Sequence, residues 1–171
     1  MRRAIGRSDK GIGLNTIEAD PDGTGMRVGV VASRFNKAIV DGLVAGALRA
    51  LADAGVADDD ITLVWVPGAF ELGTVAQELA LAGCDAVVCL GVVIRGATDH
   101  YTFVCEEAAR GVGAAARSTR TPVTFGVLTT DTVDQALERA DTSGADKGGE
   151  VARGAIEMAS ALAKIREPAT T

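Results

Sequence analysis

"AVVCLGVVIRGATDH", residues 86–100, joins a long apolar run to a polar corner of the chain. Residues 86–94 are apolar throughout, which is typical of a strand covered on both faces in a parallel sheet. The chain then turns through residues 95–99 to His100, the only histidine among 171 residues. Ligands of open α/β sheets bind beyond the carboxyl ends of the strands, so this corner is the first candidate for a site.

The same alternation extends outward from this stretch. Strands are predicted at 27–32, 61–66 and 122–129, and apolar residues at helical spacing follow each strand. Alternating strands and helices imply right-handed parallel crossovers. We therefore expect an α/β fold, a three-layer α/β/α sandwich with a central parallel four-stranded sheet. Residues 14–19 are a candidate N-terminal edge strand. We assign 1–25 to a partly disordered N-terminal arm and 26–167 to a single domain.

The last predicted helix carries an apolar stripe that is long for a helix covering only a sheet. Its members are Val151, Ala155, Met158, Leu162 and Ile165. Part of this stripe is expected to pack on another subunit.

Composition excludes several classes of protein. The net charge of -6 and the pI of about 4.8 argue against nucleic acid or an anionic membrane surface as a partner. No apolar run is long enough for a membrane span, and the start lacks the apolar segment of a secretory signal, so we expect a cytoplasmic protein. The three cysteines have no metal-binding spacing and are expected to be free thiols.

Two other strand ends carry aromatic and polar residues. Phe35 and Asn36 follow the first strand, and Phe70 and Glu71 follow the second. Each has a structural alternative: Asn36 can cap a helix, Glu71 suits the first turn of a helix, and both phenylalanines can belong to the core. In a chain with only 4% aromatic residues, two phenylalanines at neighbouring strand ends nevertheless point to a flat ligand.

The corner after the third strand has the features of an anion site. Gly96 and Ala97 allow close approach of the backbone, and Thr98 and Asp99 stand where a helix should begin. Helix capping by Thr98 or Asp99 is the alternative. His100, one turn on, can move protons near neutral pH.

The absence of several well-known motifs excludes some kinds of catalytic and cofactor sites. The sequence has no Walker loop, no GxGxxG after the first strand, no GxSxG elbow and no metal-ligand cluster. The residues alone therefore predict an enzyme or a binding domain for a planar ligand and a small phosphate, without a metal or nucleotide cofactor.

Five segments resemble, in order and separation, the 6,7-dimethyl-8-ribityllumazine synthase family, over residues 26–166. They are "RFN", "WVPGAFEL", "ALAGCDAVVCLGVVIRGATDHYTFV", "PVTFGVLTTDTVDQALERA" and "DKGGEVARGAIEMA". The resemblance implies a flavodoxin-like fold and the penultimate step of riboflavin biosynthesis. There, 5-amino-6-(D-ribitylamino)uracil condenses with 3,4-dihydroxy-2-butanone 4-phosphate, water and phosphate leave, and no cofactor is needed.

The resemblance also implies a role for each site residue. Phe35 stacks on the pyrimidine, and Asn36 and Glu71, with the backbone of Ala69 and Phe70, hold the ribityl chain. The main chain of Val92 and Val93 meets the polar edge of the ring; Gly96, Ala97 and Thr98 line the phosphate site; and His100 shuttles protons. Phe125, Arg139 and Lys147 come from the neighbouring subunit of a homopentamer, with Arg139 pairing with phosphate. The catalytic residues that the resemblance implies are therefore His100, Arg139 and Lys147.

The sequence departs from the family at four positions. Gly73 replaces a common proline, Asp99 stands beside the phosphate site, Asp141 replaces a frequent glycine, and Ser143 a lysine of some members.

Assembly of pentamers into an icosahedral shell and association with riboflavin synthase stay open, because the "ADTSGADKGG" connection is as short as in shell formers but lacks their "GTKAGNKG". The alternative function is a non-catalytic flavin- or lumazine-binding oligomer, and a flavodoxin-like electron carrier is disfavoured by the missing phosphate loop.

Overall fold

The central sheet is parallel and has four strands. The computed structural model describes residues 14–167, and its strands are β1 (Val28–Ser33), β2 (Ile61–Val66), β3 (Ala86–Ile94) and β4 (Val123–Thr130). They lie in the order β2-β1-β3-β4. The bounds of β2 and β3 are those predicted from the sequence, and β1 and β4 begin and end one residue later than predicted.

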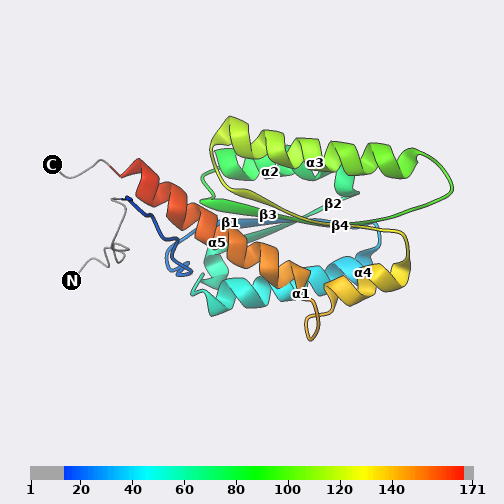
Figure 1. Ribbon diagram of the computed structural model, residues 1–171, viewed down its shortest axis with the longest axis horizontal. Helices are drawn as coiled ribbons and strands as arrows, with labels where there is room; N and C mark the ends of the chain where they lie inside the picture. Colours follow the sequence, from blue (N-terminus) through cyan, green and yellow to red (C-terminus); the bar gives the residue numbers. More distant parts are fainter. Residues whose placement is uncertain (1–13, 168–171) are drawn as a thin grey trace.

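Helices cover both faces of this sheet, which confirms the three-layer sandwich. The helices are α1 (Lys37–Asp53), α2 (Leu72–Leu81), α3 (His100–Thr119), α4 (Val133–Ala140) and α5 (Lys147–Arg166), with short 3-10 turns η1 (Asp58–Asp60) and η2 (Ala69–Glu71). Helices α2 and α3 lie on one face, and α1, α4 and α5 lie on the other (Figure 1).

Burial differs between the central and the edge strands. Every residue of β1 is buried, and β3 is buried until its last two residues. The burial on both faces that the run 86–94 predicts for β3 does not extend to β2, in which Thr62 and Leu63 are exposed, or to all of β4. Both are edge strands and have a neighbour on one side only.

Only part of the predicted apolar stripe of α5 faces the core of the chain: Val151 and Ala155 pack there, and other members point outward. The buried residues of α5 are mostly small: Gly148, Gly149, Ala152, Ala155, Ile156, Ala159 and Ser160. Ala155 belongs to both sets, but Met158 and Ile165 are exposed by 49% and 60%. The small residues face the core because α5 packs closely on α1, and the larger apolar residues are left outward.

The predicted edge strand at 14–19 is wrong. The structure places no strand there, and the segment bonds to α5 instead of a sheet edge: Lys164 Nζ donates to the carbonyl oxygen of Glu18 (2.7 Å), and the Asp20 amide donates to Ser160 Oγ (2.9 Å). Leu14 and Ile17 are exposed, so the segment buries too little apolar surface to act as a sheet strand. The expected disorder of residues 1–13 lies outside the described residues.

The structure tests two further expectations, that the three cysteines are free and that no segment spans a membrane. Cys84, Cys89 and Cys105 are free; the first two are buried, and Cys105 is half-buried. Burial raises the pKa of the Cys89 thiol to about 12. Within residues 14–167, no helix is both long and apolar enough to span a membrane.

Candidate active site

A pocket of about 600 Å³ lies beyond the carboxyl ends of β1, β2 and β3, against the first turns of α3. Parallel strands place their carboxyl ends at one edge, so residues far apart in sequence meet there. Its lining consists of Phe35, Pro67, Gly68, Ala69, Phe70, Glu71, Val92, Val93, Ile94, Gly96, Thr98, His100, Tyr101 and Val104. The structure thus brings most of the predicted site residues of one chain together.

Two phenylalanines line the pocket without being buried. Phe35 is 73% exposed and Phe70 53% exposed. The alternative that these side chains belong to the core is therefore wrong. An aromatic face held at the edge of a pocket can stack on a planar ligand, which would also remove the ring from water.

Asn36 lies at the start of α1 but does not cap it with its side chain. Its backbone is left-handed (φ 58°), and its side-chain amide Nδ2 donates to the carbonyl oxygen of Val92, 3.1 Å away. The capping alternative is therefore wrong. Instead, Asn36 ties the end of β1 to the main chain of β3 at the pocket, although its own side chain is not part of the lining.

Glu71 organises the loop between β2 and α2. Its carboxylate accepts a hydrogen bond from the Gly68 amide at 2.9 Å, which closes the η2 turn. All three residues of the turn line the pocket, and Ala69 is buried while Phe70 is exposed. The loop therefore presents a carboxylate beside an aromatic ring.

The corner at residues 95–100 is held from the side of β4. The Arg95 amide donates to the Thr130 carbonyl (2.8 Å), and Arg95 Nε donates to Asp131 Oδ1 (2.7 Å). The Arg95 guanidinium also lies over the Tyr101 ring, 4.2 Å from its centroid. These contacts fix the path by which Gly96 and Thr98 reach the pocket; Ala97 is not part of the lining.

Asp99 precedes α3 but makes no capping hydrogen bond with its side chain. Its carbonyl oxygen accepts from the Thr102 and Phe103 amides. The expected cap by Asp99 is therefore not formed, and its carboxylate does not occupy the amides of the first helical turn. The amides that precede Thr102 at the start of α3, with the positive end of the helix dipole, can face an anion.

His100 is the first residue of α3, is exposed, and lines the pocket. Among residues 14–167 its imidazole has no hydrogen-bond partner. An imidazole in this state has both ring nitrogens available to a ligand, as a proton carrier requires.

The remaining predicted residues lie elsewhere in the chain. Phe125 is on β4, Arg139 on α4 and Lys147 at the start of α5, and none of the three lines the pocket. Helices α4 and α5 lie on the face of the sheet opposite α3 (Figure 1). Arg139 Nη1 donates to the Gln135 carbonyl (2.9 Å), and Lys147 pairs with Glu150. In the described part of the chain, no lysine or arginine lines the pocket.

Sequence reasoning missed several lining residues. Pro67 and Gly68 carry only the sequence signal of a turn after β2, and Ile94 only that of the last residue of β3. Tyr101 and Val104 had a detectable signal, because they follow Thr98 at intervals of three on the helix face that leaves the phosphate corner.

Comparison with known families decides the identity. The sequence model of the 6,7-dimethyl-8-ribityllumazine synthase family matches residues 25–163. The chain belongs to the lumazine synthase family. It is therefore an enzyme, a transferase of riboflavin biosynthesis that acts on small-molecule substrates, and its sandwich is the flavodoxin-like fold of that family. Among residues 14–167, no three histidine, cysteine, aspartate or glutamate side chains are grouped to hold a metal ion.

Proposed function

We propose that this lumazine synthase condenses 5-amino-6-(D-ribitylamino)uracil with 3,4-dihydroxy-2-butanone 4-phosphate to give 6,7-dimethyl-8-ribityllumazine, with release of phosphate and water and without a cofactor. The observation that carries the proposal is the meeting of Phe35, Glu71 and His100 in one pocket of about 600 Å³. That set combines a stacking surface, a hydrogen-bond acceptor for hydroxyls and a proton carrier.

The pyrimidine occupies the aromatic end of the pocket in this proposal. Its ring stacks on Phe35, and its polar edge meets the main chain of Val92 and Val93. Asn36, which bonds the Val92 carbonyl, holds this stretch of main chain in place. The ribityl hydroxyls bond to Asn36 and Glu71 and to the backbone of Ala69 and Phe70 on the η2 loop.

The phosphate of the second substrate lies against Gly96, Ala97 and Thr98 at the start of α3. Backbone amides and the helix dipole favour an anion there. Because no cation of the described chain lines the pocket, the charge partner is Arg139 of a neighbouring copy, with Lys147 and Phe125 of that copy completing the wall.

The condensation of the two substrates needs proton transfers at several of its steps. The 5-amino nitrogen attacks the ketone carbonyl, and the resulting carbinolamine loses its oxygen as water, which His100 assists by donating a proton. A proton is then removed from C3 of the butanone as the C4–O bond to phosphate breaks, which leaves an enol, and cationic and backbone donors stabilise the departing phosphate. The enol takes up a proton at C4 and becomes a ketone at C3, the group that the second nitrogen attacks. The ribityl-bearing nitrogen finally closes the second ring with loss of water. Holding both substrates in register supplies much of the rate.

A shared site requires an oligomer. We propose a homopentamer in which each pocket faces Arg139 of the next subunit. Exposed apolar residues on β4 and α5, namely Phe125, Met158 and Ile165, support contact with another copy. Light scattering distinguishes a pentamer from an icosahedral shell of twelve pentamers.

The direct test is incubation of the purified protein with both substrates while the fluorescence of the lumazine is followed. Product should form above the uncatalysed rate with chelator present or absent. A rate equal to the background would reject the proposal. Tight binding of lumazine or flavin without turnover would instead favour a non-catalytic binder.

A further inference from the structure

Asp146 lies at the junction between the α4–α5 connection and α5. Its backbone is left-handed (φ 43°), a conformation that aspartate adopts uncommonly, and its side chain is only 14% exposed. A carboxylate in this position needs partners, because burial without them is costly.

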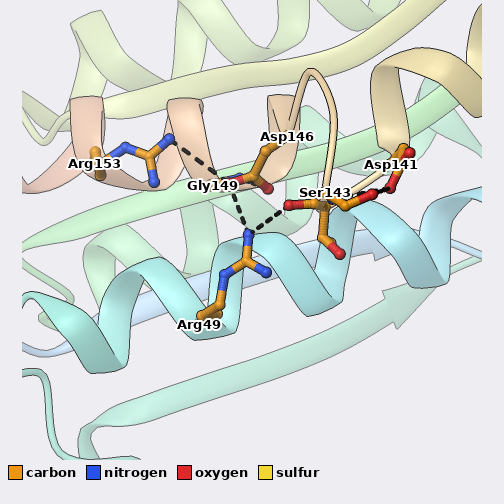
Figure 2. Close-up of polar contacts among 7 residues, drawn as sticks. Arg49, Asp141, Ser143, Asp146, Gly149 and Arg153 are labelled. Atoms are coloured by element: carbon orange, nitrogen blue, oxygen red, sulfur yellow. Dashed lines mark hydrogen bonds and ion pairs between the residues drawn. The ribbon is translucent and has the colours of Figure 1, made fainter.

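Three groups surround this carboxylate (Figure 2). Asp146 Oδ1 accepts from the Gly149 amide at 3.2 Å and so caps α5. Asp146 Oδ2 pairs with Arg49 Nη2 at 3.0 Å and with Arg153 Nη2 at 3.7 Å. One side chain thus joins α5 to α1, since Arg49 belongs to α1 and Arg153 to α5.

Further hydrogen bonds join the rest of the α4–α5 connection to Arg49 and Asp146. Arg49 Nη2 also donates to the Thr142 carbonyl at 3.1 Å, and the Asp146 amide donates to the Asp141 carbonyl at 2.9 Å. Asp141 in turn accepts from the amide and the hydroxyl of Ser143. Two of the positions that depart from the family, Asp141 and Ser143, are therefore partners of one another (Figure 2).

Close packing against α1 leaves Asp146 and the first turn of α5 little room to move. A Cβ atom on Gly46 of α1 would collide with Asp146 Oδ1, and one on Gly148 would collide with the Leu43 carbonyl. The first turn of α5 therefore sits directly on α1. Movement of the connection would have to break the Arg49 contacts and the cap together.

Arg139 and Lys147 flank this connection. Arg139 is two residues before Asp141, at the end of α4, and Lys147 directly follows Asp146. We propose that Asp146 is a positioning residue that sets the placement of Arg139 and Lys147 for the phosphate substrate. This inference rests on the proposed function, in which both cations serve the pocket of a neighbouring copy.

Asp146→Asn is the informative variant. Asparagine, which stands at this place in the "GTKAGNKG" of shell formers, suits the left-handed backbone and retains an oxygen for the Gly149 amide. In this chain it gives up the charge that pairs with Arg49 and Arg153, and the loss is expected from those two pairs. Small displacements of positioned groups have large kinetic effects. We expect kcat/KM for the butanone phosphate to fall on the order of 10-fold or more, while the KM for the ribitylaminouracil changes little. Glu107→Gln, which removes the exposed Glu107–Arg110 pair of α3, is the control and should leave both unchanged.

Double mutants separate positioning from general damage. In Arg139→Ala and Lys147→Ala backgrounds, adding Asp146→Asn should cost much less than in the wild type, because the groups it positions are gone. An undiminished cost in both backgrounds would overturn the proposal. So would a variant that loses melting temperature but keeps the wild-type kcat/KM for the phosphate substrate.

If Asp146→Asn fails to fold, Arg49→Gln tests the same proposal through a residue of α1. It removes the contacts to Asp146 and Thr142 and should reproduce the same selective loss; a wild-type kcat/KM in this variant would count against the proposal. A wild-type protein that makes no lumazine would reject the proposed function and this inference with it. An active wild type with indifferent Asp146 and Arg49 variants would reject the inference alone.

Discussion

The backbones of Gly73 and Gly111 are in direct contact where α2 and α3 cross. A Cβ atom added to Gly73 would lie 2.5 Å from the carbonyl carbon of Gly111, whereas one added to Gly111 would lie 3.4 Å from Gly73 Cα. The contact is thus asymmetric: only Gly73 must lack a side chain. The crossing brings α3 against α2, which directly follows the η2 loop, and residues of both α3 and that loop line the pocket.

This asymmetry gives a matched pair of stability predictions. Gly73→Ala should lower the free energy of unfolding by about 1–3 kcal/mol, because a backbone must shift to admit the methyl group. Gly111→Ala should raise it by about 0.5–1 kcal/mol, because alanine suits a helix interior better than glycine and meets only ordinary contact. Urea denaturation measures both. Equal effects of the two substitutions would contradict the asymmetric crossing.

His100→Ala should reduce turnover about 10²- to 10⁴-fold, the usual contribution of a positioned proton carrier. Binding of a ribityl-pyrimidine analogue should be nearly unchanged, because Phe35 and Glu71 remain. Steady-state kinetics and calorimetric titration measure the two quantities. His100→Gln, which retains polarity without a titratable group, is the control and should be equally slow. Full turnover in either variant would exclude a proton-transfer role.

Mixed oligomers should recover activity from two impaired variants. His100→Ala damages the pocket, and Arg139→Ala damages the cation proposed to come from the next subunit. In a ring with random 1:1 mixing, about a quarter of the sites combine an intact pocket with an intact arginine. Activity after joint refolding should therefore exceed the sum of the separate variants. No recovery, with mixed oligomers shown to form, would place both groups in one chain.

The thiols should differ in reactivity. Ellman's reagent should modify Cys105 first in the native protein, and Cys84 and Cys89 only after unfolding, because the last two are buried. Single cysteine-to-alanine variants identify the reacting thiol. Early modification of Cys89 would show that the sheet centre opens readily.

The raised pKa of Cys89 also predicts a dependence of stability on pH. The folded thiol stays protonated to about pH 12, whereas the unfolded thiol ionises near 9. The folded state therefore holds more protons in this range, and stability should fall as pH rises from about 9 towards 12, by up to about 1.4 kcal/mol per pH unit from this group. Cys89→Ala should make the decline shallower. An identical slope in the variant would remove Cys89 as its cause.

The parts of the fold that the sequence predicts well are those that depend on chain order and continuous apolar runs. β2 and β3 were bounded correctly because each is such a run between turn residues. Phe35, Phe70 and His100 were found because they follow the strands of a parallel sheet, where strand ends meet.

The failures depend on tertiary contact. Residues 14–19 have the composition of a strand, but only the path along α5 decides where their backbone bonds. In α5, hydrophobicity favours Met158 and Ile165, whereas close packing on α1 selects alanines. Likewise, the bond from Asn36 to Val92 joins positions 56 residues apart and has no local signature. Arg139 and Lys147 lie away from the pocket of their own chain, and the pattern of a single sequence does not indicate which pocket they serve.

The burial of the alanine face of α5 has a consequence for synthesis of the protein. Ala152, Ala155 and Ile156 complete the core that also holds Val88 and Leu90 of β3. A growing chain has all four strands, α1 and α4 before it has this helix, so the part of the sheet that α5 covers, on β3 and β4, stays open to solvent while residues 147–166 are still being made. Translational arrest in that interval would leave a nascent chain that pairs its strands but exposes aliphatic surface, which is the form that chaperones and proteases recognise.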